Sequence, residues 1–187
     1  HIPRRMNQVI AVLQAVQALH ERKGIIHGDL RWLNVVIASN SDLVTLIDFD
    51  MAAVGDIKTA KTAFAGHALF WILEHFLGRV YPSGLTLELP DGVRHPNAKG
   101  GCQLMFEHDV YACGGLLSLV CCDDGKVAAV VKETAGALMH VDRPITLSAA
   151  IEALQSCALS EVRIVDRVQV LQVHCGTGSP PRPGQGQ

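Results

Sequence analysis

The sequence predicts an α+β fold that is predominantly helical, and two observations support this prediction. Apolar residues recur at steps of three and four between residues 6 and 19, which marks one face of an amphipathic helix. Two short β-rich runs, residues 35–37 and 43–47, flank a turn-forming segment at residues 40–42. The 187 residues are 49% hydrophobic and 18% charged, which fits a single globular domain with a substantial core.

The overall charge and the cysteines exclude several classes of protein. A formal net charge of −2 favours neither nucleic acid nor an anionic membrane as a partner. No apolar run approaches the ~20 residues that span a bilayer, so we expect no transmembrane segment. The six cysteines lack CxxC spacing, and no secretory signal is visible. We therefore expect reduced thiols and an intracellular protein, cytoplasmic or nuclear.

The amphipathic helix at residues 6–19 has recognisable signals at both ends. Pro3 suits a first helical turn, while Arg22, Lys23 and Gly24 are typical of a helix C-terminus. The sequence begins at His1 and not at Met, so we expect a piece of a longer protein.

Oxygen-bearing side chains gather at the open end of the predicted hairpin. If the hairpin is centred on Ser41, the numbers of paired residues add up to 82, and Asn34 lies opposite Asp48. An amide oxygen and a carboxylate are ligands that Mg²⁺ prefers, usually with substrate phosphates completing its shell. Asp29, five residues before Asn34, adds a third polar group at the same end.

Four stretches carry a family resemblance. Residues 27–34, HGDLRWLN, resemble the protein-kinase catalytic loop HRDLxxxN, and residues 48–50, DFD, resemble the DFG motif that follows it. Residues 108–117, HDVYACGGLL, are similar to the DVWSxGxxL segment that opens the central helix of the kinase large lobe. Residues 143–146, RPIT, resemble the segment that precedes the closing helix, which Thr146 could cap. The resemblance covers residues 1–155 and implies the large, C-terminal lobe of a protein-kinase-like fold.

The resemblance also implies roles for individual residues. Asp29 would accept or orient the proton of the substrate hydroxyl, and Arg31 would stabilise charge on the γ-phosphate of ATP. Asn34 and Asp48 would hold Mg²⁺ and thereby the nucleotide, and His27 would be mostly architectural. Asp109 would hold the catalytic-loop backbone by hydrogen bonds. From its position alone, Asp109 could equally be the N-cap of the following helix.

Two positions depart from the family pattern. Gly28 replaces the arginine of HRD, which in many kinases reads a phosphorylated activation loop, so we do not expect that form of regulation. Asp50 replaces the glycine of DFG and limits positive φ values at that position.

Other segments are less legible. We expect residues 64–79 to be an insertion into the family pattern. Within them, residues 68–77 predict a buried helix or, alternatively, a surface helix that docks on a partner or a membrane. Residues 81–99 predict a loop, in the place of the kinase activation segment. Residues 156–174 form an extension that fits strand or helix, and residues 175–187, rich in Gly and Pro, predict a disordered tail.

The kinase small lobe has no counterpart in the sequence, because no Gly-rich loop or strand lysine precedes His27. The resemblance implies ATP-dependent phosphoryl transfer to a protein Ser/Thr hydroxyl, completed by a missing N-lobe or a partner surface. HGD and IDFD look as much like aminoglycoside and choline kinases, which act on small molecules, and crinkler-type effector kinases carry similar loops. A non-catalytic pseudokinase or binding fragment is the third alternative.

Overall fold

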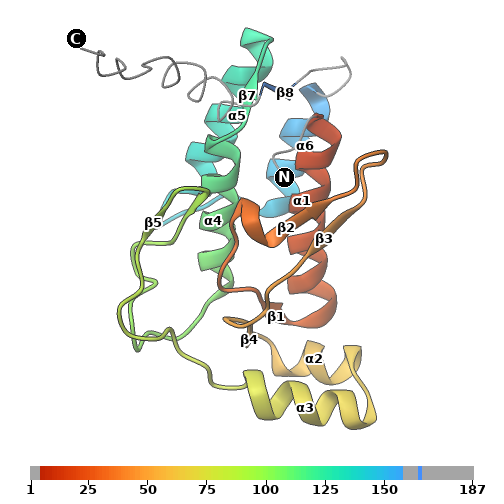
Figure 1. The fold of residues 1–187 in the computed structure, drawn as a ribbon, viewed down its shortest axis with the longest axis vertical. Coiled ribbons are helices and arrows are strands. Elements are labelled where there is room, and N and C mark those ends of the chain that lie inside the picture. The colour runs from red at the N-terminus through yellow and green to blue at the C-terminus, as the bar shows by residue number, and fades with distance from the viewer. Residues whose placement is uncertain (1–4, 158–163, 166–187) are drawn as a thin grey trace, which may run out of the picture.

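A computed structural model describes residues 5–157 and 164–165 of the chain (Figure 1). It has the expected α+β architecture, mostly helical, with small antiparallel two-stranded sheets. The helical elements are α1 Met6–Ala18, the π-helical turn η1 Leu19–Lys23, the 3₁₀ turn η2 Trp32–Asn34, α2 Ile57–Ala63, α3 Gly66–Phe76, α4 Phe106–Ser118, α5 Gly125–Leu138 and α6 Leu147–Cys157. The strands are β1 Ile25–Ile26, β2 Val35–Ile37, β3 Val44–Leu46, β4 Ala53–Val54, β5 Glu88–Leu89, β6 Gly92–Val93, β7 Cys121–Cys122 and β8 Ile164–Val165.

The main core lies between α1, α4, α5 and α6, which form one bundle in Figure 1. The predicted amphipathic helix is confirmed: Val9, Leu13 and Val16 of α1 are at most 2% exposed in this core. Gly24 ends the helical segment in the left-handed region at φ 65°, as its sequence position predicts. Burial of these apolar faces holds the bundle together and fixes the elements that carry the candidate site.

The β2–β3 hairpin forms, but its predicted register is wrong by one residue. Val35 pairs with Leu46 and Ile37 with Val44, so partner numbers add up to 81 and not to 82. The reason lies in the turn: the N–H of Ala38 donates to the carbonyl of Leu43 at 3.0 Å, which leaves an even, four-residue loop. A one-residue shift exchanges the faces to which side chains point, so Asn34 and Asp48 are not a cross-strand pair.

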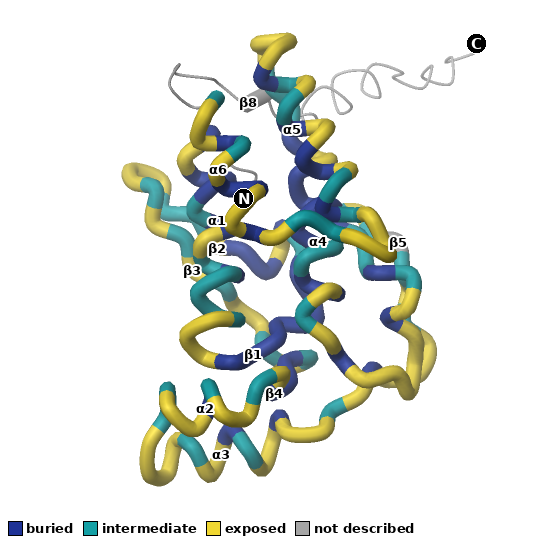
Figure 2. Tube along the Cα trace, turned by 180° about the vertical axis from the view of Figure 1, so that it is seen from behind, coloured by how far each residue is buried: buried dark blue, intermediate teal, exposed yellow. Residues whose placement is uncertain are grey.

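The prediction of a buried helix at residues 68–77 is also wrong. Helix α3 forms over Gly66–Phe76, but Phe70 and Trp71 are 63% and 46% exposed. Only Ile72 and Phe76 of α3 are buried, against Ala52, Val54 and α2. Together α2 and α3 lie at one end of the molecule, where Figure 2 shows mostly exposed and half-buried chain.

Residues 81–99, predicted as a loop, contain the small β5–β6 hairpin. Strand β6 packs on α4 at Gly115, where an added Cβ would lie 2.2 Å from a methyl of Val93. In the described residues, no helix has the length and apolar character needed to cross a membrane. The five cysteines that the structure describes are free thiols. The predicted disordered tail at residues 175–187 lies outside the described residues, as does most of the extension at 156–174.

Candidate functional site

Most residues of the catalytic-type loop, 27–34, are buried, and hydrogen bonds attach the loop to α4, to the end of the β2–β3 hairpin and to the β5–β6 hairpin. Gly28 adopts φ 79°, and a Cβ there would lie 2.6 Å from the carbonyl oxygen of Met51. No side chain fits at this position without moving backbone, which explains why glycine stands where kinases carry arginine. The indole of Trp32 anchors the loop to α4 by donating to the carbonyl of Leu116 at 3.2 Å.

Asp109 lies in the first turn of α4 and is 1% exposed. Its carboxylate accepts hydrogen bonds from the backbone N–H of His27 at 2.7 Å and of Gly28 at 2.9 Å. The expected contact with the loop backbone is therefore present. The N-cap of α4 is Met105, so the alternative role of Asp109 as the N-cap is wrong.

A third partner of Asp109, His20 of η1, was missed by sequence reasoning. Its Nε2 donates to Oδ2 of Asp109 at 2.9 Å. Burial opposes ionisation of Asp109, but the hydrogen bond and charge of His20, the charge of His27 and the Gly28 N–H outweigh it, so the pKa of Asp109 lies below its ordinary value. A lone histidine at a helix end gives no sequence signal for such a contact.

His27 connects the loop to the end of the β2–β3 hairpin. Its Nε2 donates to the carbonyl of Ile47 at 3.0 Å, and its Nδ1 accepts from the N–H of Asp29 at 3.4 Å. The imidazole also contacts the ring of Phe49, with centroids 4.7 Å apart. His27 thus fixes the loop relative to the DFD segment by contacts of its own.

Asp29 and Asn34 are brought together. Asn34 is 4% exposed, and its Nδ2 donates to the backbone carbonyl of Asp29 at 2.9 Å and to Oδ2 of Asp29 at 3.2 Å. Because Nδ2 has these two acceptors, Oδ1 is the atom of Asn34 that remains for a cation. Arg31 lies next to them, with Nε 3.6 Å from Oδ2 of Asp29.

Asp48 stands in a different environment. It is exposed, as is Asp50, and it is the one described non-glycine residue with a positive φ, at 62°. Asp tolerates this left-handed conformation better than most residues. The N–H of Ile47, the preceding residue, donates to the carbonyl of Asn34 at 3.0 Å, so Asp48 follows directly after the last hairpin contact.

Sequence reasoning also missed Asp91 and Arg94, which the β5–β6 hairpin brings to the loop. Arg94 forms an ion pair with Oδ1 of Asp29. Asp91 accepts the N–H of Trp32 on its carbonyl at 3.0 Å and the N–H of Leu33 on its carboxylate at 2.9 Å. A Pro-Asp-Gly turn signal at residues 90–92 could have predicted the hairpin, although not its position.

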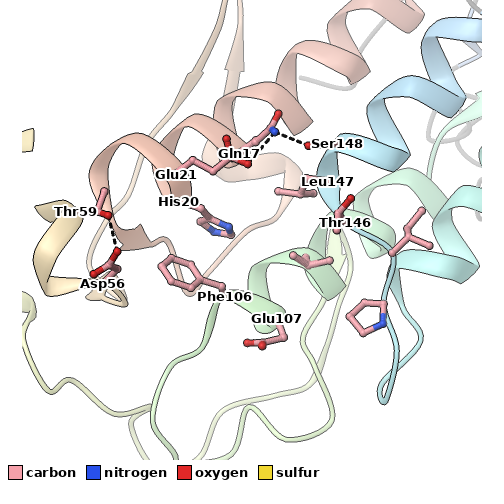
Figure 3. A pocket seen from close by; sticks show the side chains of 13 residues that line it. Gln17, His20, Glu21, Asp56, Thr59, Phe106, Glu107, Thr146, Leu147 and Ser148 are labelled. Carbon is pink, nitrogen blue, oxygen red and sulfur yellow. Dashed lines mark hydrogen bonds between the residues drawn. The ribbon is translucent and has the colours of Figure 1, made fainter.

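A separate cleft of about 400 Å³ lies beside the candidate site (Figure 3). His20 lines it together with Phe106, whose ring centroid is 4.7 Å away. Asp56 in this cleft is engaged with Thr59, as Figure 3 shows. None of the predicted catalytic or metal-binding residues lines this cleft.

A comparison with protein families gives a match over the N-terminal part of the chain. The model of a phosphotransferase enzyme family, APH, matches residues 1–58, which include His27, Asp29, Asn34 and Asp48. This match supports a relationship to the protein-kinase-like superfamily and to phosphotransferases. No curated protein matches the chain.

Proposed function

We propose that this chain carries the phosphoryl-transfer site of an ATP-dependent phosphotransferase. The observation that supports the proposal most is the arrangement of Asp29 and Asn34 on one buried loop, inside the segment that matches the phosphotransferase family. Asp109 would be a positioning residue, because it holds the backbone of His27 and Gly28 and touches no reacting atom.

In the proposed reaction the carboxylate of Asp29 accepts the proton of the acceptor hydroxyl. The hydroxyl oxygen forms a bond to the γ-phosphorus of ATP, the bond from that phosphorus to the bridging oxygen breaks, and ADP leaves. Arg31 would face the charge on the transferred group. The acceptor is a Ser or Thr hydroxyl of a protein in the first form of this proposal.

Two side chains offer oxygen atoms of the kind that bind a hard cation. Asn34 offers its free Oδ1, and Asp48 offers an exposed carboxylate, and these are oxygen ligands of the kind that Mg²⁺ takes with substrate phosphates. Asn34 and Asp48 would hold the cation, whose charge would offset the negative charge of the phosphates. The proposed ligands are one amide and one carboxylate; within the described residues, no group of three or more His, Cys, Asp or Glu offers a metal site of another kind.

A small-molecule alcohol is the second candidate acceptor. The match of residues 1–58 to the APH family favours it, because the HGD and IDFD segments lie within that match.

We expect the transfer rate to be low. In kinases, groups of the small lobe hold the phosphates of ATP, and this sequence does not resemble that lobe. We expect the chain alone to transfer phosphate far below the ordinary kinase rates of ~1–100 s⁻¹.

The test is transfer of radiolabelled γ-phosphate from ATP, with Mg²⁺, to serine peptides and to a panel of small alcohols. We expect slow transfer that is lost in Asp29→Asn and kept in a control substitution of an exposed acid, Asp123→Asn. Equal transfer by Asp29→Asn and the parent chain would contradict the role of Asp29. Absence of transfer from both acceptor classes would favour a non-catalytic binding module.

A further inference from the structure

Unpaired N–H donors surround the Asp29 carboxylate. The Nε atoms of Arg31 and Arg94 are both buried, and neither has a hydrogen-bond partner among the described residues. Nε of Arg31 is 3.6 Å from Oδ2 of Asp29, which is too long for a hydrogen bond. Buried donors without acceptors are costly, so two of them on the arginines that pair with Asp29 point to an acceptor-rich ligand.

Arg94 is held in place and cannot simply turn to solvent. Its Nη1 donates to the carbonyl of Thr86 at 2.7 Å, and its backbone N–H donates to the carbonyl of Leu87 at 2.8 Å. Its side chain is only 11% exposed. The guanidinium is therefore preorganised beside Asp29 by the β5–β6 hairpin.

Each oxygen of Asp29 has a partner in this arrangement. Oδ1 is paired with Arg94, and Oδ2 accepts from Asn34. Each oxygen keeps a second lone pair, but a substrate hydroxyl that approaches Oδ1 meets the guanidinium of Arg94 there. An oxyanion competes well with a carboxylate for a guanidinium, so its binding to Arg94 would open Oδ1 of Asp29 to the hydroxyl.

We propose that the acceptor substrate carries an oxyanion, a phosphate or carboxylate, close to its reacting hydroxyl, and that this group binds between Arg31 and Arg94. The inference rests on the proposed phosphotransferase function. Binding of the oxyanion fills the two unpaired Nε–H donors and replaces Asp29 as the partner of the Arg94 guanidinium. Oδ1 of Asp29 then becomes available for the hydroxyl of the same molecule. An acceptor without an anionic group leaves Asp29 paired with Arg94.

Charge balance sets the expected strength of this site. Two guanidinium groups face two carboxylates, those of Asp29 and Asp91, so the cluster is neutral before the ligand binds. Oδ2 of Asp91 accepts the N–H of Leu33, which holds this side chain in place, while its buried Oδ1 has no hydrogen bond to a described residue and lies 3.9 Å from Nη1 of Arg31. The oxyanion therefore competes mainly with Asp29, and removal of the Asp29 charge must strengthen its binding.

The test uses inorganic phosphate as a probe and the arginine Nε–Hε NMR signals of the full chain as the readout. Phosphate is expected to shift the signals of Arg94 and Arg31 but not that of exposed Arg22. Arg94→Gln should weaken phosphate binding at least about 10-fold, and Arg94→Lys less, since charge-assisted hydrogen bonds are lost. Arg22→Gln is the matched control and should bind as the parent does.

Asp29→Asn gives the most discriminating result, because it should raise the affinity for phosphate by about 3–10-fold. A second arm compares glycerol 2-phosphate with a serine peptide that has acidic flanking residues, which separates a small anionic acceptor from a protein one. The proposal would be overturned if neither of these two compounds nor phosphate shifts the arginine Nε–Hε signals. It would also be overturned if Asp29→Asn binds phosphate more weakly than the parent chain. Larger shifts by spermidine than by the anions would also overturn it.

These outcomes are independent of the transfer reaction, since none of them requires ATP. Unchanged amide signals of His27 and Gly28 in Arg94→Gln show that the loop stays folded, so weaker binding reports the missing guanidinium. If phosphate binds as expected but Asp29→Asn transfers phosphate normally, the proposed function fails and the anion site stands. If transfer depends on Asp29 but phosphate does not reach Arg94, the anion site fails alone.

Discussion

The two halves of the candidate site are built differently. Asp29 and Asn34 are 9% and 4% exposed and are tied to each other, to His27 and, through the loop backbone, to Asp109. Asp48 and Asp50 are exposed, and Asp48 holds a left-handed backbone conformation. One half is fixed by buried hydrogen bonds before any ligand arrives, whereas the other presents its carboxylates to solvent.

This difference suggests a division of labour. A base and an orienting amide need a fixed geometry, and the buried loop supplies it at the cost of desolvating Asp109 and Asp29. A cation ligand must exchange water for metal and phosphate oxygens, which an exposed carboxylate does more readily. Substitutions in the first half should therefore lower the stability of the fold, and substitutions in the second half should weaken ligand binding.

Asp109→Ala should give the largest loss of stability. The N–H groups of His27 and Gly28 and the Nε2–H of His20 lose their buried acceptor, for an expected loss of about 2–4 kcal/mol. Urea unfolding measures the loss, and amide exchange at His27 and Gly28 localises it. Asp123→Ala, at an exposed acid, should stay within about 0.5 kcal/mol of the parent. An equal effect of the two substitutions would show that Asp109 does not anchor the loop.

Asn34→Ala should cost about 1–3 kcal/mol, because it removes a buried amide and leaves the carbonyl of Asp29 without its donor. Thermal or urea unfolding provides the value. Asn40→Ala, in the exposed turn of the same hairpin, is the control. A cost for Asn34→Ala no larger than that control would mean that the loop is not fixed by the amide.

Acid should weaken the packing of residues 81–106 on α4, and the loss of stability should be smaller than that caused by Asp109→Ala or Asn34→Ala. The rings of His95 and His108 lie 5.0 Å apart, and each Nδ1 accepts a backbone N–H, from Asn97 at 3.0 Å and from Met105 at 3.3 Å. Burial lowers the pKa of both imidazoles from the ordinary value of 6.5, and the charge of His95 lowers the pKa of His108 further. The charge of Glu107 acts against this lowering at both histidines, and the charge of Asp109 acts against it at His108, but neither outweighs burial. Tyr81 and Tyr111 face the same rings.

Because the folded pKa values are lowered, the unfolded chain binds more protons, and stability present above pH 6.5 is lost as the pH falls below it. The unfolding free energy measured between pH 7.5 and about 5 should decrease with acid. His108→Gln should flatten this dependence, whereas His67→Gln, at an exposed position, should leave it unchanged. A dependence identical in all three proteins would contradict the assignment.

Asp48→Gly should have the smallest effect on stability, and it should stabilise the protein, whereas the substitutions above destabilise it. Relief of the positive φ should stabilise the fold by up to about 1 kcal/mol. Asp50→Gly, at a neighbouring exposed position without a positive φ, should instead destabilise by about 0.5 kcal/mol, since glycine enlarges the unfolded ensemble. Unfolding curves of the two variants give the comparison. A destabilising Asp48→Gly would show that the Asp48 side chain makes structural contacts.

The sequence predicted the elements whose signals are local. The period of α1, the αL position of Gly24 and the hydroxyl cap at Thr146, which accepts the N–H of Ala149 at 3.1 Å, are all present. The hairpin was predicted and its register missed, because register depends on whether the turn has an odd or even number of residues. The apolar residues of α3 were assigned to the core, but only one side of that helix finds a partner.

The site shows the same limit. Asp29, Arg31, Asn34, Asp48 and Asp109 were found because three stretches, residues 27–34, 48–50 and 108–117, carry a resemblance, and their chemical roles remain predictions. His20, Asp91 and Arg94 come from segments with no motif and reach the loop only through tertiary packing, so sequence alone could not place them. Contacts between residues far apart in the chain, such as Arg94 with Asp29, depend on how β6 docks on α4.

The most direct test of the account is paramagnetic broadening by Mn²⁺, used in place of Mg²⁺, with ATP present and absent. We predict that Mn²⁺ with ATP broadens the Asn34 side-chain NH₂ and Asp48 amide signals, and that Asp48→Ala raises the required Mn²⁺ concentration at least about 10-fold. Asp29→Asn should retain the broadening, because Asp29 is assigned to the proton and not to the cation. Broadening of these signals that is unchanged in Asp48→Ala, or that appears only at other carboxylates, would contradict the division of the site into a fixed base and an exposed cation ligand.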